Sequence, residues 1–156
     1  MLDFEDFKNL VKNAPLFAID LVVLNERNQI LIGQRKNAPA KGFWFVPGGR
    51  VFKDETQAQA VQRISQAELG CELTRDQLGL LGIFDHFYDD SCFDNEISTH
   101  YINATHLVRL ETHRLNFPKD QHTDYRWVTL ETLVADDSIH TYSKIFLPTL
   151  KQWLNQ

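Results

Sequence analysis

Residues 48–71 read GGRVFKDETQAQAVQRISQAELGC, and most of what the sequence predicts about architecture starts from this stretch. Between Glu55 and Gly70 there is no proline and no internal glycine, so the pattern predicts a helix that Gly70 terminates. Apolar residues gather on one side of that helix at a period of about 3.6 residues. The members of this side are Ala60, Val61, Ile64, Ala67 and Cys71. Before the helix, Gly48 and Gly49 permit unusual backbone angles, so we expect a loop there that a ligand or ion can approach closely.

Segments on both sides of this helix have the character of strands. Residues 16–25 and 30–35 are rich in β-forming side chains around a polar turn, which predicts a hairpin. Further strands are expected at residues 43–46, 78–87, 100–110 and 125–128, and further helices at residues 3–12, 130–135 and 143–154. No repeat, linker or low-complexity tract interrupts the chain. The mixture predicts a single mixed α/β domain over residues 1–156, with helices packed on a sheet.

The composition limits what the protein can bind. The chain has 156 residues, of which 43% are hydrophobic and 24% charged, so it can bury a substantial core. Its formal net charge of -5 lacks the broad positive field of nucleic-acid binding, and any polyanionic ligand must be met by a few placed arginines. Two cysteines cannot form a disulfide framework. Because no signal peptide and no membrane-length apolar run is recognisable, we expect a cytoplasmic protein with no nucleic-acid and no membrane partner.

The opening stretch also carries glycines, carboxylates and an arginine at the spacings of the Nudix box, and it resembles the Nudix hydrolase family. The box positions are held by Gly49, Glu55, Arg63, Glu68 and Gly70. Three other positions depart from the box. Ile64 and Ala67 stand where the family has glutamates, and Ser65 stands where it has an apolar residue. Most of the clustered carboxylates of the box are therefore missing.

Flanking motifs make the sequence similar to family members that hydrolyse GDP-mannose. These motifs are FWFVPGGRV at residues 43–51, HFYDD at 86–90, THY at 99–101 and DQHTDYRW at 120–127. The resemblance implies a Nudix-like α/β/α sandwich with a mixed sheet, one Mg²⁺ per subunit, with Mn²⁺ possible, and a homodimer. It further implies that water attacks the anomeric carbon of a GDP-sugar, GDP-mannose or GDP-glucose, with inversion. The products would be GDP and the free hexose.

Three arginines are candidates for neutralising a diphosphate. A planar guanidinium can bind phosphate oxygens bidentately, and the resemblance places Arg35, Arg50 and Arg63 around the phosphates and the metal. Arg35 and Arg50 are expected to be catalytic, because they would stabilise charge on the leaving GDP. Arg63 is expected to bind substrate, with orientation of a carboxylate as the alternative.

Glu68 is the strongest candidate for a metal ligand. Helical geometry places it beside the apolar side of its helix, where a carboxylate is costly unless it is paired or bound to a metal. A salt-bridged glutamate is the alternative. The resemblance completes the ligand set with Gln121 and a backbone carbonyl at Gly48 or Gly49, together with phosphate oxygens and water. The role of Glu55 stays open, because an acidic side chain at a helix start favours the helix dipole in any protein.

The sequence has six histidines, and the resemblance selects His122 as the general base that accepts a proton from water. A loop histidine without a catalytic role is the alternative. Candidates for binding the sugar hydroxyls are Asp20, His86 and Tyr101, each of which could equally be paired within the fold. Tyr88 and Tyr125 could contact the ligand or pack in the core.

The missing box glutamates leave more than one activity open. Ile64 and Ala67 can neither bind a metal nor activate water, which favours attack at the sugar carbon with a base on a separate loop. One alternative is attack at phosphorus, which releases a nucleoside monophosphate and a sugar phosphate. Another is a non-catalytic sensor of nucleotide sugars. RNA processing, a third alternative, is disfavoured by the net charge.

Overall fold

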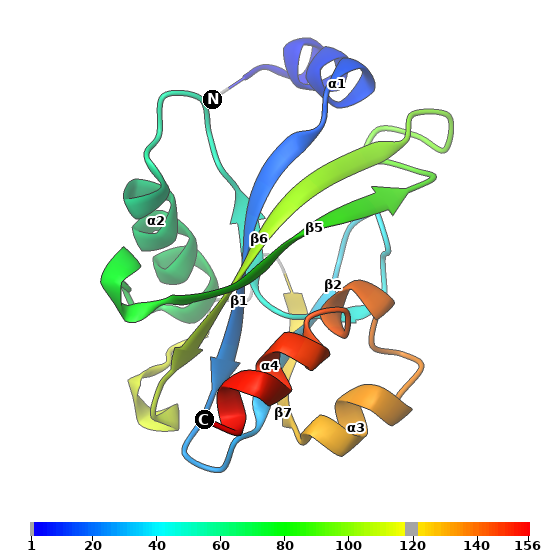
Figure 1. The fold of residues 1–156 in the computed structure, drawn as a ribbon. Helices are drawn as coiled ribbons and strands as arrows, with labels where there is room; N and C mark the ends of the chain where they lie inside the picture. The colour runs from blue at the N-terminus through cyan, green and yellow to red at the C-terminus, as the bar shows by residue number, and fades with distance from the viewer. Residues whose placement is uncertain (1, 118–121) are drawn as a thin grey trace.

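A seven-stranded mixed sheet with helices on both faces forms the core of the computed structural model, which describes residues 2–117 and 122–156 (Figure 1). In chain order the helices and strands are α1 (Phe4–Asn13), β1 (Leu16–Leu24), β2 (Ile30–Arg35), β3 (Trp44–Phe45), β4 (Gly48–Arg50), α2 (Gln57–Leu69), β5 (Gly79–Tyr88), β6 (Thr99–Arg109), β7 (His122–Val128), α3 (Leu130–Ala135) and α4 (Leu147–Leu154). Helix α2 covers one face of the sheet, and α3 and α4 cover the other, so the expected α/β/α sandwich is confirmed. Within the described ranges, no helix is long and apolar enough to cross a membrane.

Strand β1 lies at the centre of the sheet and has different neighbours along its length. It runs parallel to β6 from Leu16, opposite Tyr101, to Leu24, opposite Arg109. On its other edge β4 pairs with the first half of the strand, whereas β2 pairs with it only where Leu24 lies opposite Ile30. Strands β3 and β7 pair with β2. The expected hairpin therefore forms, but β1 and β2 separate beyond its turn.

Both faces of β1 are buried, as is typical of a strand between two helical layers. Ile19 and Leu21 pack with Val61 and Ile64 of α2 in one core cluster. The alternate residues belong to a second cluster that α3 and α4 cover. Its members include Val22, Leu24, Leu133, Phe146 and Leu150. Asp20 is the charged residue of β1, and alternation places it on the same face as this second cluster.

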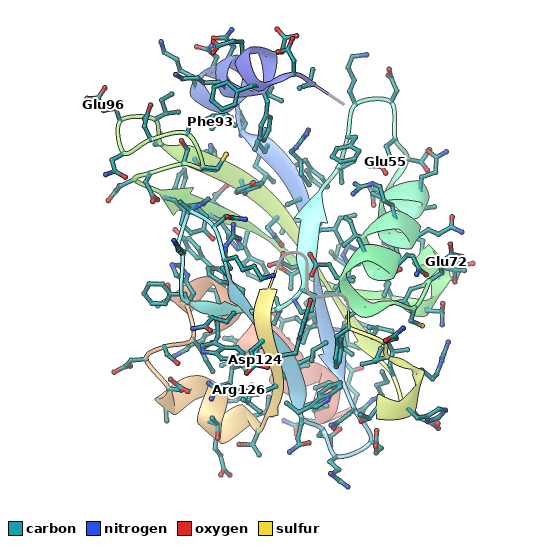
Figure 2. The ribbon with its side chains drawn as sticks, turned by 180° about the vertical axis from the view of Figure 1, so that it is seen from behind. Glu55, Glu72, Phe93, Glu96, Asp124 and Arg126 are labelled. Atoms are coloured by element: carbon teal, nitrogen blue, oxygen red, sulfur yellow. The ribbon has the colours of Figure 1, made fainter. Side chains whose placement is uncertain are left out.

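Helix α2 begins later than the sequence predicts. The Thr56 hydroxyl accepts a hydrogen bond from the Gln59 N–H at 3.1 Å, and the Gln59 side chain accepts one from the Thr56 N–H at 2.8 Å, which forms a capping box. Gly70 ends the helix with a φ of 63°, as expected. Glu55 lies just before the cap residue, beside the start of α2 (Figure 2), and is outside the helix itself.

The buried face of α2 also differs from the predicted one. Ala67 is exposed and Cys71 lies beyond the helix, whereas Ser65 and Glu68 are buried. Ser65 is satisfied there, because its Oγ accepts a hydrogen bond from the Leu73 N–H at 2.9 Å. A search for apolar periodicity misses Ser65, because its buried side chain is polar.

The expected helix at residues 143–154 is shorter in the structure. Thr141–Ser143 forms a 3₁₀ turn, and α4 begins at Leu147. Pro148 lies in the first turn of α4, where the missing N–H of proline has no consequence for helical hydrogen bonding.

The glycine pair lies in a strand instead of the expected loop. Gly48 and Gly49 belong to β4, and the glycines with positive φ are Gly42 and Gly70. The expectation of unusual backbone angles is therefore wrong. Close approach explains these glycines better, since a Cβ at Gly49 would lie 2.9 Å from Cγ1 of Ile64 in α2.

Candidate functional site

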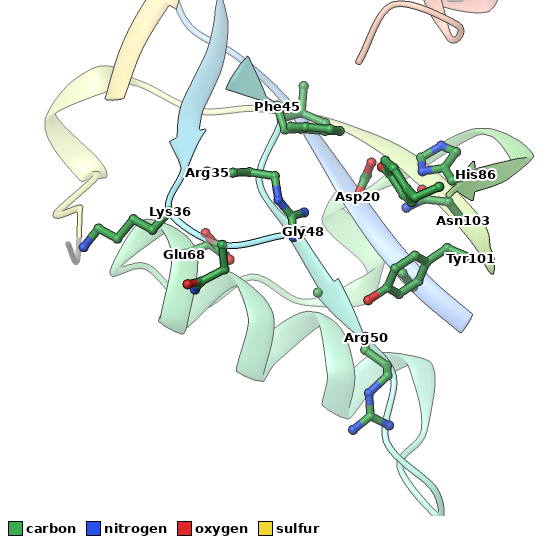
Figure 3. Close-up of a pocket in the computed structure, with 15 residues that line it drawn as sticks. Asp20, Arg35, Lys36, Phe45, Gly48, Arg50, Glu68, His86, Tyr101 and Asn103 are labelled. Carbon is green, nitrogen blue, oxygen red and sulfur yellow. The ribbon is translucent and has the colours of Figure 1, made fainter. Parts of the chain in front are cut away.

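A cavity of about 220 Å³ opens where β1 and β2 separate, and Figure 3 shows the side chains that line it. The predicted site residues around this cavity are Asp20, Arg35, Gly48, Gly49, Arg50, Glu68, His86 and Tyr101. Tyr88, whose role the sequence leaves open, lines it as well. The fold thus brings residues of β1, β2, β4, β5, β6 and α2 to one site.

The sheet supplies one polar wall of the cavity. Ala18 lies opposite Asn103 in the parallel β1–β6 ladder, and His86 lies opposite Tyr101 in the antiparallel β5–β6 ladder. Because side chains alternate between faces, Asp20, Tyr101, Asn103 and His86 all project from the same face. The sequence analysis missed Asn103, although the two-residue period from Tyr101 indicates its face.

Asp20 lies directly opposite Gly48 in the antiparallel β1–β4 ladder. The Leu21 N–H donates to the Pro47 carbonyl at 2.8 Å, so the next residue pair, Asp20 with Gly48, does not exchange hydrogen bonds. Side chains are closest at such pairs, and a Cβ on Gly48 would collide with Asp20 Oδ1. The Gly48 peptide groups are turned away from β1 and are available to a ligand.

The surroundings of Asp20 raise the pKa of its carboxyl. Burial raises the pKa of Asp20 to about 7, and the negative charge of Glu68 adds to the rise. A hydrogen bond with Asn103 and the positive charge of Arg35 oppose it. The Asn103 amide is oriented for this contact, because its Oδ1 accepts a hydrogen bond from the Thr105 hydroxyl at 2.9 Å. The two carboxyls, of Asp20 and Glu68, therefore interact electrostatically.

The donor set fits a divalent metal ion. Glu68 is 2% exposed and faces the cavity from α2, and Asp20 lines the same cavity from β1. Carboxylates and a backbone carbonyl, such as that of Gly48, are the hard oxygen ligands that Mg²⁺ prefers. Among the side chains that the structure describes, which exclude those of residues 118–123, no group of three or more His, Cys, Asp or Glu is placed to hold a metal. A site of this kind suits an ion that shares its ligands with substrate phosphates.

Arg35 of β2 and Arg50 of β4 both line the cavity and carry positive charge. Arg35 ends β2, its guanidinium lies 5.3 Å from the centre of the Phe45 ring, and Figure 3 shows it pointing inward. Arg50 ends β4, and its guanidinium lies 4.8 Å from the ring centre of both Phe7 and Phe52. Partial burial lowers the pKa of Arg50, although an arginine remains protonated in proteins.

Arg63 is not among the residues that line the cavity. Its Nε donates to Glu55 Oε1 at 2.7 Å and one terminal nitrogen donates to the Arg50 carbonyl at 2.7 Å. Glu55 also accepts a hydrogen bond from the Phe52 N–H at 2.8 Å, and Arg63 holds the pKa of that carboxyl below its usual range. Arg63 therefore links α2 to the segment after β4, and Glu55 accepts hydrogen bonds from Arg63 in this link.

His86 lines the cavity and is supported by an aromatic residue that the sequence analysis missed, Tyr142. Its ring stacks on Tyr142 at 4.3 Å, with an interplanar angle of 1°. The Tyr142 hydroxyl in turn donates to the Phe87 carbonyl at 2.8 Å and accepts from the Phe87 N–H at 2.8 Å. His86 Nε2 is buried and has no hydrogen-bond partner among the described residues, so it is available to a ligand. No local sequence pattern predicts the link between Tyr142 and β5.

Two of the predicted residues cannot be placed. Gln121 lies outside the described residues, and so does the side chain of His122. The backbone of His122 begins β7, where its Cα lies opposite that of Arg35. Their roles as metal ligand and base stay predictions. Tyr125 stacks on Phe117 at 4.7 Å and is not among the cavity-lining residues.

Comparison with known proteins identifies the family. The model of the NUDIX domain matches residues 15–150, so the chain belongs to the Nudix family. It is 41% identical over 111 residues to the low-salt glycan biosynthesis protein Agl8 of Haloferax volcanii, across 71% of this chain and 69% of that protein. The predicted family is confirmed, and with it a hydrolase activity of the kind that typically needs a divalent metal ion.

Solved structures agree with this assignment. The chain is similar to the MutT NUDIX hydrolase of Burkholderia pseudomallei, with a TM-score of 0.71, 26% identity, and coverage of 88% of this chain and 98% of that one. It is also similar to the NUDIX domain of Shewanella oneidensis NrtR, solved with ADP ribose, with a TM-score of 0.69, 17% identity, and coverage of 98% and 94%. The second likeness shows the fold alone.

Proposed function

We propose that this Nudix protein is a GDP-mannose mannosyl hydrolase, which converts GDP-mannose and GDP-glucose to GDP and the free hexose. Water attacks the anomeric carbon with inversion, the carbon–oxygen bond to the diphosphate breaks, and GDP leaves. One Mg²⁺, or Mn²⁺, serves each subunit of a homodimer. The similarity to a glycan biosynthesis protein supports a substrate of this class.

The observation that carries the proposal is what α2 presents to the cavity. Glu68 faces the cavity, whereas Ile64 is buried beneath Gly49 and Ala67 is exposed. Helix α2 thus offers one carboxylate that can bind a metal. It offers no second carboxylate that could activate water. A reaction whose base lies elsewhere, across the sugar from the diphosphate, is compatible with that arrangement.

The remaining cavity residues suit a leaving GDP. Arg35 and Arg50 would bind the diphosphate and stabilise the negative charge that develops as the bond to the sugar breaks. Glu68 and the Gly48 carbonyl would hold the metal ion, which supplies further positive charge to the diphosphate when bound. His86 Nε2 and the Tyr101 hydroxyl are polar groups for the sugar hydroxyls.

The proposed base is His122, with Gln121 beside it as a further metal ligand. Because the first residue of β7 lies opposite Arg35, the backbone of the base is next to the strand that carries a phosphate-binding arginine. General-base assistance of this kind contributes about 10²- to 10⁴-fold to the rate.

Attack at phosphorus is the second candidate, and Asp20 favours it. A carboxyl with a pKa of about 7, close to the carboxylate of Glu68, has the proton affinity of a general base at neutral pH. That reaction would release GMP and a hexose phosphate from the same GDP-sugar.

Product identification separates these functions. The purified protein is incubated with Mg²⁺ and with GDP-mannose, GDP-glucose, UDP-glucose or ADP-ribose, and the products are resolved by chromatography. GDP with free hexose is the expected result. GMP with hexose phosphate would replace the proposal by the second candidate, and binding of GDP-mannose without turnover would indicate a sensor.

A further inference from the structure

Helix α1 precedes residues 15–150, the part of the chain that matches the Nudix family, yet it reaches the candidate site. It lies at the end of the sheet where β1 begins (Figure 1). Asp3 caps its N-terminus by accepting a hydrogen bond from the Asp6 N–H at 2.8 Å. Its Phe7 ring touches Arg50, which lines the cavity. An element outside the family-matched region therefore contacts a proposed phosphate-binding residue.

The guanidinium of Arg50 contacts two aromatic rings. Its central carbon is 4.8 Å from the ring centre of Phe7 in α1 and 4.8 Å from that of Phe52, which follows β4. Aromatic rings attract a guanidinium electrostatically and by stacking. Contact with two rings restricts the rotamers of a long side chain that would otherwise move freely. The arginine is thereby held ready for an anion before the anion arrives.

The Phe7 ring is itself held in place. Phe93, in the segment between β5 and β6, packs edge-on against Phe7 at 5.5 Å and against Phe4 at 5.0 Å. Figure 2 shows Phe93 on that segment beside α1. Phe4 is 62% exposed, and its ring packs against that of Phe93. Phe7 is thus the aromatic residue of α1 that links this packing to Arg50.

We infer that Phe7 is a positioning residue, which holds the Arg50 guanidinium at the cavity for the diphosphate of the substrate. The inference rests on the proposed function, in which Arg50 stabilises the leaving GDP. Replacing the Phe7 ring removes one of the two rings beside the Arg50 guanidinium, so the arginine gains rotamer freedom and must be ordered again during each turnover. Arg50 interacts most strongly with the charge that develops on the leaving GDP. Loss of the Phe7 ring should therefore lower kcat more than it raises KM.

A set of variants tests this role. In Phe7→Leu, which keeps an apolar side chain but loses the ring, we expect kcat for GDP-mannose to fall by roughly 5- to 30-fold, the range of a desolvated cation–π contact. Phe7→Tyr keeps the ring and should restore most of the loss. Phe4→Leu, on the same helix, is the matched control and should retain wild-type kcat. Thermal unfolding of all three shows whether α1 stays docked.

The double variant separates positioning from general destabilisation. In the Arg50→Ala background, Phe7→Leu should cause no further loss, because the residue it positions is gone. Additive losses, or equal losses in Phe4→Leu and Phe7→Leu, would overturn the inference. Failure of the proposed role of Arg50 has a different signature, namely wild-type turnover in Arg50→Ala itself. Calorimetry of GDP binding to the same variants gives a readout that does not depend on turnover. The affinity for GDP should fall in Phe7→Leu and in Arg50→Ala, and it should not fall in Phe4→Leu.

Discussion

Asp20 occupies the space that a side chain at position 48 would fill. The two residues lie opposite each other in the β1–β4 ladder, and a Cβ on Gly48 would collide with Asp20 Oδ1 and lie 2.7 Å from the Ile19 carbonyl oxygen. Since the φ of Gly48 is not positive, glycine is required there by the carboxylate opposite it and not by the backbone angle. The collision is on the cavity side of the strand, so this glycine belongs to the site.

Gly48→Ala should therefore damage both stability and activity. The added methyl displaces Asp20 or β4, and we expect the free energy of unfolding to fall by about 1–3 kcal/mol, as for other overpacked sites. Turnover should fall because the displaced Asp20 also interacts with Arg35. Denaturant unfolding and steady-state kinetics measure the two effects. Asp20→Ala in the same background should recover part of the stability without recovering activity, because the Ile19 carbonyl oxygen still lies 2.7 Å from the added Cβ. A Gly48→Ala protein with wild-type behaviour would contradict the steric argument.

Local patterns predict much of this fold, because they act within one element. The helix from residue 57 to 69 follows from its apolar period and from Gly70, and the strands follow from their composition. The glycine pair was interpreted wrongly because glycine signals either a turn or a close contact, and only the partner distinguishes them. For Gly48 this partner is Asp20, which is far from Gly48 in the sequence.

The site itself depends on register between distant strands, which no single-strand pattern contains. Alternation gives the face of Asn103 once Tyr101 is placed, but only the β1–β6 pairing brings that face beside Asp20. The stack of Tyr142 on His86 joins a C-terminal turn to β5 in the same way. The sequence does predict Arg35, Arg50 and Glu68 as site residues, because the family resemblance already contains the tertiary arrangement, and all three line the cavity.

Glu68→Gln tests the metal site. The exchange keeps the shape of the side chain and removes the charge that a divalent cation requires, so we expect Mg²⁺ affinity to fall by at least about 10-fold and turnover to fall with it. Glu72→Gln is the matched control, since Glu72 is exposed and accepts a hydrogen bond from Gln62 on the outer side of α2. Mg²⁺ titration of activity and calorimetry give the affinities. Equal Mg²⁺ affinity in both variants would remove Glu68 from the metal site.

Arg35→Ala should mainly lower turnover, whereas Arg63→Ala should mainly lower stability. Arg35 faces the cavity, so its loss should lower kcat by about 10²- to 10³-fold, the range for losing one group that stabilises developing charge, with little effect on unfolding. Arg63 binds Glu55 and the Arg50 carbonyl, so its loss should lower the free energy of unfolding by about 1 kcal/mol and affect turnover less. Kinetics and thermal unfolding on both proteins distinguish the two. A larger catalytic loss in Arg63→Ala would place Arg63 in direct contact with substrate.

Acidification should destabilise the protein through His86. Burial lowers the pKa of His86 from 6.5 to about 4, so below pH 6.5 the unfolded chain takes up a proton that the folded chain does not. The contribution of His86 to the free energy of unfolding should therefore fall as pH drops from 6.5 to 4, by at most about 1.4 kcal/mol per pH unit. Asp20 acts in the opposite sense over this range, because its raised pKa of about 7 lets the folded chain bind a proton that the unfolded chain does not. The difference between the wild-type protein and His86→Phe, measured at each pH, isolates the His86 contribution. His113→Gln, at an exposed histidine, should leave the slope unchanged.

Hydrolysis in ¹⁸O-labelled water tests which bond breaks. If water attacks the anomeric carbon, the new oxygen enters the hexose and the GDP is released without label. Mass spectrometry of the GDP is the decisive measurement, because the anomeric oxygen of a free hexose also exchanges slowly with water. A parallel incubation of unlabelled hexose in labelled water corrects for that exchange. Labelled GDP, or label in GMP or hexose phosphate, would show attack at phosphorus despite Ile64 and Ala67.

The configuration of the released sugar completes this test. Direct displacement by water inverts the anomeric carbon, so an α-linked substrate should first yield the β-hexose, which rapid NMR can observe before mutarotation. Retention would require a covalent intermediate on a carboxylate about 5 Å from its acid partner. Asp20 is the sheet carboxylate in the cavity, and it interacts electrostatically with Arg35 and Glu68, which the proposal places on the diphosphate and metal side of the sugar. Inversion with unlabelled GDP is therefore the expected outcome, and retention would assign Asp20 a covalent role.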